Sequence, residues 1–191
     1  MNNYFVLVID LEATCADDGS IPEDSMETIE IGACWANLEG GVMDRFQSFV
    51  RPVKNPVLTN FCTNLTGICQ EDVSVAPLFP DAARLLREFV DRHKTTETSI
   101  WVSWGSYDFT QIARDSSNHS TPNPIDLPHF NAKKLYAKAQ KIGKQVGMAR
   151  AIELSGLSFT GTHHRALDDA LNIARLLPWV YGLKTLKTSD L

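Results

Sequence analysis

Apolar and polar positions along the first part of the chain predict several β-strands. The run over residues 4–10 (YFVLVID) is short, continuous and β-branched, as in a fully buried strand. Residues 28–38 and 42–52 alternate well enough to form two further strands, and a Gly-Gly pair between them suits a hairpin turn. Residues 99–105 (SIWVSWG) predict another buried strand, which ends at a glycine.

Spacings of three and four between apolar residues predict helices in the rest of the chain. The clearest case is the segment 78–94, where the periodic positions are Leu78, Ala82, Leu85, Leu86, Phe89 and Val90. Further helices are expected at residues 106–115, about 131–142, about 145–155 and about 166–181, with an irregular, proline-containing loop over 116–130. Leading strands followed by alternating helices and strands indicate an α/β fold, with a mixed central β-sheet flanked by α-helices.

The composition narrows the class of protein. We expect residues 1–191 to form a single domain with its core at about 4–181. The net charge of −5, from 18 basic and 23 acidic residues, means that any surface for nucleic acid must be local. Four cysteines without CxxC spacing argue against structural zinc and indicate reduced thiols. The first apolar run is too short for a signal peptide or membrane span, so we expect a cytoplasmic protein without membrane association.

Two carboxylates stand at the end of the first predicted strand. Asp10 and Glu12 are two residues apart and therefore point to the same face of a strand. Like charges held together at the end of a buried strand require a neutralising cation, and carboxylate oxygens favour Mg²⁺ or Mn²⁺. Asp108 begins the helix after the 99–105 strand, where the ends of sheet strands tend to bring ligands together. Solvated loop carboxylates, and an Asp that only complements a helix dipole, are the structural alternatives.

The segment GTHHRALDDALNIARLL at 161–177 contains two possible histidine–aspartate pairs at the same spacing of five residues. In a helix that begins near residue 166, the stripe through Asp169 is apolar and continues through Ile173, Leu176 and Val180. The stripe through Asp168 is polar and continues through Asn172 and Arg175. We therefore expect Asp169 to face the protein and Asp168 to face solvent. His163 and His164 precede the helix on a loop, where an imidazole can serve as a general base; two merely exposed histidines are the alternative.

Together these residues supply what a two-metal phosphoryl-transfer site needs. Such a site uses several carboxylates to hold two cations, and a base to deprotonate water. The candidate set is Asp10, Glu12, Asp108, Asp169 and His164.

Three motifs in this order resemble the signature motifs of the DEDDh 3′–5′ exonucleases. They are DLEAT at 10–14, Asp108 in SWGSYDF at 103–109, and HRALDD at 164–169. That superfamily includes proofreading exonucleases and RNase T, and it has a ribonuclease H-like fold. The resemblance is closest to the branch of the histone-mRNA and small-RNA 3′ exonucleases and the prion-interactor exonuclease. DLEATC, FCTNLTGICQEDV at 61–73 and HRALDDALNIARL carry that closer match, and the likeness covers about residues 4–181.

The resemblance implies a role for each matching residue. One Mg²⁺ or Mn²⁺ ion would be held by the residues Asp10, Glu12 and Asp169. A second ion would be held by Asp10 and Asp108, and the water would be activated by His164. The resemblance also places Ala13, Thr14, Leu65 and Thr66 near the terminal nucleotide. Animal members of this branch have an additional N-terminal RNA-binding domain, which we do not expect here because the chain begins three residues before its first predicted strand.

A basic segment lies between residues 131 and 152, where there is no acidic residue. Its bases are Lys133, Lys134, Lys138, Lys141, Lys144 and Arg150. Lys134, Lys138 and Lys141 would share one face of a helix over 131–142, which suits the phosphates of a nucleic acid, although a solvated helix face is the alternative. Phe130, Tyr136 and Trp104 are candidates to stack on bases, unless they belong to the core.

The sequence therefore predicts a 3′–5′ exonuclease that depends on a divalent metal. The partner would be single-stranded RNA or DNA with a free 3′ end, and the products would be nucleoside 5′-monophosphates; RNA is favoured by the branch resemblance alone. The alternatives are a DNA proofreading or trimming exonuclease with the same site, a non-catalytic nucleic-acid-binding module, and an endonuclease of the ribonuclease H type. A binding module would have lost a ligand, and the loop histidine argues against the endonuclease.

Overall fold

The computed structural model describes residues 5–95 and 99–186. Its centre is a mixed five-stranded sheet with the strand order β3-β2-β1-β4-β5. The strands are β1 (Phe5–Ala13), β2 (Thr28–Asn37), β3 (Val42–Phe49), β4 (Ile100–Ser103) and β5 (His129–Asn131). β1, β2 and β3 pair antiparallel, whereas β4 and β5 run parallel to β1. The predicted mixed α/β sheet is confirmed.

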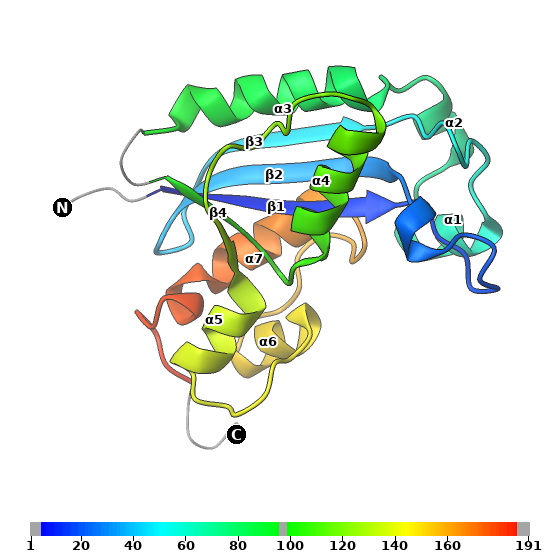
Figure 1. Cartoon of the computed structure of the whole chain (residues 1–191). Coiled ribbons are helices and arrows are strands. Elements are labelled where there is room, and N and C mark those ends of the chain that lie inside the picture. Colours follow the sequence, from blue (N-terminus) through cyan, green and yellow to red (C-terminus); the bar gives the residue numbers. More distant parts are fainter. Residues whose placement is uncertain (1–4, 96–98, 187–191) are drawn as a thin grey trace.

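Helices cover both faces of this sheet (Figure 1). The helices are α1 (Asn60–Thr66), α2 (Gln70–Ser74), α3 (Phe79–His93), α4 (Tyr107–Asn118), α5 (Ala132–Ala139), α6 (Met148–Leu154) and α7 (Ala166–Val180). Alternate residues of β1 enter two different cores: Leu7 and Ile9 pack under α3, whereas Val6 and Val8 pack under α5, α6 and α7. In the described part of the chain, no helix is long and apolar enough to span a membrane.

The predicted strands and helices are present, with ends that differ by a few residues, but two short α-helices and one short strand were not predicted. They are α1, α2 and β5, and the three-residue β5 overlaps the end of the loop that we expected at 116–130. α5 ends at Ala139, so Lys141 does not extend its face; this residue follows the helix with a φ of 55°. Leu85, expected on the buried stripe of α3, is 37% exposed.

The start of α7 packs unusually close to the sheet. A Cβ atom at Gly32 of β2 would lie 2.1 Å from the backbone of Ala166 and Leu167. In the antiparallel register Gly32 stands opposite Asp10 of β1. The missing side chain therefore lets the first turn of α7 settle beside the last residues of β1, which positions the site described next.

Candidate active site

Three carboxylates converge where the end of β1 meets the first turn of α7. Asp10 and Glu12 continue the face of β1 that Val6 and Val8 turn towards α7. Carboxylate oxygens of Asp10, Glu12 and Asp169 lie within 4.8 Å of one another. Asp169 is 3% exposed and Glu12 is 8% exposed. The predicted meeting of these residues is therefore present in the structure.

Asp108 approaches the same place from the first turn of α4. β4 pairs with β1 only as far as Val8, so the β1 backbone beyond this residue has no β4 partner on that edge. The Leu11 amide instead donates a hydrogen bond to Asp108 Oδ1 at 3.1 Å. Asp108 is buried, and its charge is one of the causes that raise the pKa of Asp10. Asp108, the fourth predicted carboxylate, is therefore close enough to interact electrostatically with the other three.

The cluster is electrostatically costly for the protein alone. Burial, followed by the charges of Asp108 and Asp169, holds the pKa of Asp10 well above its usual range. Burial and the neighbouring acids raise the pKa of Glu12 to about 8, and burial raises that of Asp108 to about 6. Burial also raises the pKa of Asp169. These shifts have a common physical cause, because additional negative charge is unfavourable in a site with little water.

This donor set fits hard divalent cations. Among the residues that the structure describes, the only basic side chains within ion-pair distance of the four carboxylates are the two histidines of the 161–165 loop. Neither Lys nor Arg neutralises the cluster within that distance. Buried carboxylates are normally paired or coordinate a metal, and all-oxygen donors suit Mg²⁺ or Mn²⁺. The chemistry of the residues present therefore agrees with a metal site.

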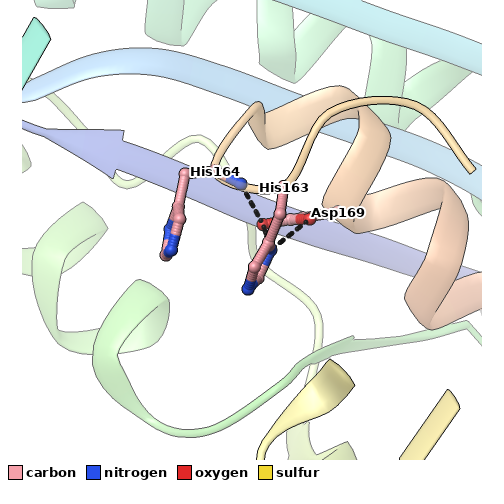
Figure 2. A group of neighbouring side chains, drawn as sticks. All are labelled: His163, His164 and Asp169. Atoms are coloured by element: carbon pink, nitrogen blue, oxygen red, sulfur yellow. Dashed lines mark hydrogen bonds and ion pairs between the residues drawn. The ribbon is translucent and has the colours of Figure 1, made fainter. Parts of the chain in front are cut away.

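Figure 2 shows that the side chains of His163 and His164 lie side by side and point in the same direction, with His163 against Asp169, although adjacent residues of an extended chain point to opposite sides. His164 has a φ of 63°, and this left-handed conformation turns its side chain to the side of its neighbour. The two rings stack with centroids 4.1 Å apart. His163 Nδ1 lies 3.1 and 3.2 Å from the two oxygens of Asp169, and the His164 amide donates to Asp169 Oδ2.

Asp169, and not Asp168, is the acid that both histidines contact. His163 contacts this carboxylate through its ring, and His164 donates a hydrogen bond to it from its backbone amide. The His164 ring is instead near Glu12, with 4.0 Å between Nδ1 and Oε1. Burial, with His163 nearby, lowers the pKa of His164 and so favours its neutral form. His163 was not expected to contact Asp169, since the sequence pairs it by spacing with Asp168.

The polar stripe of α7 does not face open solvent as predicted. Asn172 is fully buried, and its side chain bonds the backbone of Thr160 and the carbonyl of Asp168. Asp168 accepts a hydrogen bond from the Thr162 amide. The segment before the histidines lies over this stripe, because its backbone groups need the polar partners that the stripe supplies. Asp168 is therefore a structural anchor of the loop.

A buried ion pair that sequence reasoning missed anchors the other side of the loop. Glu30 of β2 is fully buried and stands opposite Glu12 in the strand register. Its carboxylate accepts hydrogen bonds from Arg165 Nε at 3.1 Å, from Arg165 Nη2 at 3.2 Å and from the Ala166 amide at 3.1 Å. The only signal in the sequence was an acid at a buried position of the strand pattern. The pair fixes the residues between His164 and α7.

The residues expected near a terminal nucleotide lie where α1 meets the end of β1. The Thr14 hydroxyl accepts from the Glu27 amide, and the Thr66 hydroxyl bonds backbone groups of its own turn. Both threonines are about 1% exposed, and Ala13 is 8% exposed, so these side chains offer little surface. Leu65 is 38% exposed and is the member of the set that presents an apolar side chain to solvent.

The basic segment forms a surface hollow, though with a different third lysine from the one predicted. The hollow is lined by Lys134, Ala137, Lys138, Gly143, Lys144 and Gln145. Asn131, which caps α5, donates to the hydroxyl of Ser106 at the start of α4, so α5 begins beside the helix that carries Asp108. Tyr136 is fully buried and hydrogen-bonded, which excludes it as a stacking platform. Phe130 remains 43% exposed.

Comparisons with known proteins agree on one family. The RNase T model, described as an exonuclease, matches residues 7–177. The human protein named 3′-5′ exoribonuclease 1 is 32% identical over 182 residues, which cover 90% of this chain and 51% of that protein. A Bacillus subtilis protein named probable 3′-5′ exonuclease KapD is 32% identical, over 94% of this chain and 86% of its own length. The chain thus spans about half the length of the human relative.

Solved structures give the same result. The nuclease domain of 3′hExo, described as a DEDDh family member bound to rAMP, superposes with a TM-score of 0.81 at 27% identity. The match covers 95% of this chain and 92% of that domain. The ribonuclease H-like fold expected from the sequence is therefore confirmed, with the four carboxylates on its central sheet and adjoining helices.

Proposed function

Since the chain belongs to the RNase T family of exonucleases, we propose that it is a 3′–5′ exonuclease that hydrolyses single-stranded nucleic acid, preferentially RNA, to nucleoside 5′-monophosphates. The observation that carries this proposal is the convergence of Asp10, Glu12, Asp108 and Asp169 beside two loop histidines. Use of a divalent metal is a property of the family, and the buried acids give it a physical reason here.

The proposed cofactor is Mg²⁺ or Mn²⁺, with two ions in each active site. Asp10, Glu12 and Asp169 would hold one ion, and Asp10 with Asp108 would hold the other. Bound divalent cations supply charge stabilisation to the attacking and leaving oxygens of a phosphodiester. The positive charge of these ions would favour the ionised carboxylates and so offset the burial that raises the pKa values of Asp10 and Glu12.

His164 is the proposed general base. Its side chain is 40% exposed, so water reaches it, and its lowered pKa keeps a ring nitrogen free to accept a proton. The Glu30–Arg165 pair and the Asp169 carboxylate hold its backbone from both sides. Asp169 thus has two proposed functions, as a ligand and as a support for the histidine loop.

The 3′ end of the substrate would lie between α1 and the carboxylates. Leu65 offers apolar contact for the terminal nucleotide, with Ala13, Thr14 and Thr66 shaping the wall behind it. Lys134, Lys138 and Lys141 remain the proposed phosphate contacts, and Lys144 joins them because it lines the same hollow as the first two. A local basic surface of this kind suits an otherwise acidic chain.

RNA is proposed over DNA because the human relative is named an exoribonuclease and the 3′hExo domain was solved with rAMP. A DNA-trimming exonuclease with the same site is the second candidate, and substrate comparison separates the two. A non-catalytic binding module is disfavoured because every predicted carboxylate is present in the cluster.

The decisive experiment uses 5′-labelled RNA and DNA oligomers, single- and double-stranded, with Mg²⁺, Mn²⁺ or EDTA. We expect a descending ladder on single strands, strong slowing by a 3′-terminal phosphate, and loss of turnover in the Asp10→Asn variant. Full activity in EDTA, or equally efficient cutting of a circular single strand, would refute the proposal. Faster trimming of DNA than of RNA would favour the second candidate.

A cytoplasmic location is also proposed. All four cysteines are free thiols, as expected for a reducing compartment. Fractionation of cells that produce the tagged protein tests this, and recovery from a secreted or membrane fraction would contradict it.

A further inference from the structure

A second group of potential metal ligands shares one residue with the carboxylate cluster. His163, His164 and Asp169 each offer a ligand atom, and these atoms lie within 4.8 Å of one another. Asp169 is also a member of the group that contains Asp10 and Glu12. We propose that His163, His164 and Asp169 form a second metal site, overlapping the carboxylate cluster at Asp169, for a borderline transition-metal ion such as Zn²⁺, and that its occupation inhibits the enzyme.

The local geometry brings the three ligands together before any ion binds. The left-handed backbone at His164 directs two adjacent imidazoles to the same side, as Figure 2 shows. His163 Nδ1 lies 3.1 Å from Asp169 Oδ1, close to the separation of about 3.3 Å between two ligands on a tetrahedral zinc ion with bonds near 2.0 Å. A zinc ion would replace the hydrogen between these atoms, and the proton of a neutral His163 ring would move to Nε2.

The ligand types distinguish this site from the carboxylate cluster. Imidazole nitrogens favour zinc, copper and nickel, whereas carboxylate oxygens favour magnesium and manganese. Two nitrogens and one oxygen leave a fourth position open on a zinc ion, which water can fill. The side chains of His163 and His164 are 45% and 40% exposed, so an ion can reach them from solvent.

Occupation of this site would remove two groups from the proposed reaction. Zinc on Asp169 would compete with the magnesium ion that this carboxylate is proposed to hold, and zinc on His164 would block the base. The inhibition rests on the proposed function, whereas the binding rests on the three side chains alone. A binding experiment without substrate therefore separates the two.

The test titrates metal-free protein with Zn²⁺ in competition with a chromophoric chelator. His163→Gln should weaken zinc binding at least tenfold, since even the loss of an outer-shell partner costs about 10–100-fold in metal affinity. The control His119→Gln removes an imidazole that stacks on Phe79, away from the cluster, and should leave zinc affinity unchanged. Asp10→Asn should also retain zinc binding, since Asp10 is not a ligand of this site.

Equal zinc affinity in wild type and His163→Gln would overturn the proposal. So would loss of zinc binding in Asp10→Asn with retention in His163→Gln, because zinc would then occupy the carboxylate cluster. In the wild-type protein, ring nitrogen resonances of His163 and His164, and not those of His119, should shift as zinc is added; unchanged resonances would refute the site without any variant. In the Mg²⁺-dependent assay, zinc should inhibit the wild-type enzyme. The same zinc concentration should not lower the rate of His163→Gln below the rate of that variant without zinc.

Discussion

Replacing Glu12 with Gln should stabilise the metal-free protein while it abolishes turnover. Glu12 is 8% exposed and lies among the acids of the cluster, so its ionised form is unfavourable without a cation. Gln has nearly the same shape and carries no charge. The substitution should therefore remove an electrostatic cost and leave the packing nearly as it is.

The pKa of Glu12 sets the size of the effect. It is raised from 4.5 to about 8, mainly by burial. Between these two values the unfolded chain has lost the proton while the folded protein keeps it, so stability falls as pH rises, by about 1.4 kcal/mol per pH unit. At pH 7, which is 2.5 units above 4.5, the accumulated cost is about 3 kcal/mol. Glu12→Gln should be more stable than wild type by up to this amount.

Urea denaturation in EDTA at pH 5 and pH 7 measures this difference. The advantage of Glu12→Gln should be small at pH 5 and largest at pH 7, because the cost appears only above pH 4.5. Glu39→Gln, an exposed carboxylate in the β2–β3 turn, serves as the control and should match wild type at both values. Saturating Mg²⁺ should stabilise wild type more than Glu12→Gln. A variant no more stable than wild type at pH 7, or an advantage equal at both pH values, would refute the reasoning.

Three further predictions concern the histidines, the basic surface and the buried ion pair. His164→Ala should lower kcat about 10²–10⁴-fold, the usual contribution of a general base, whereas His163→Ala should cost less than about tenfold, or ~1.4 kcal/mol; assays at saturating Mg²⁺ that give the reverse order would reassign the base. Substitution of three lysines by Gln should raise KM, weaken its salt dependence and leave kcat nearly unchanged; an unaltered salt dependence would make this surface a solvated helix face. The three are Lys134, Lys138 and Lys144. Arg165→Met should destabilise the protein by about 3–5 kcal/mol, because it leaves the buried Glu30 carboxylate without its ion partner. Adding Glu30→Gln should restore much of the loss in denaturation experiments. A single variant within about 0.5 kcal/mol of wild type, the usual range of a surface substitution, would contradict the assignment.

The long elements and the candidate ligands could be predicted from local patterns in the sequence. Apolar periodicity indicates which side of an element is buried, and it correctly predicted β1, α3 and α7. The same pattern predicted that Asp169 faces the protein interior, where it is buried. Residue spacing along one strand put Asp10 and Glu12 on the same face. Both arguments are local, because a strand or helix fixes the direction of its own side chains.

The way in which these elements meet depends on contacts between distant segments and could not be predicted. The close approach of α7 depends on the missing side chain at Gly32, on a strand more than 130 residues earlier in the chain. Nothing in the sequence around Asp108 indicates that its carboxylate accepts a hydrogen bond from the Leu11 amide. Likewise, the sequence around Arg165 does not indicate that its side chain forms an ion pair with Glu30. The left-handed turn at His164 is set by hydrogen bonds to neighbouring elements, so the spacing of five residues could not show that both histidines address Asp169. Contacts of this kind depend on packing between distant segments, which local periodicity does not encode.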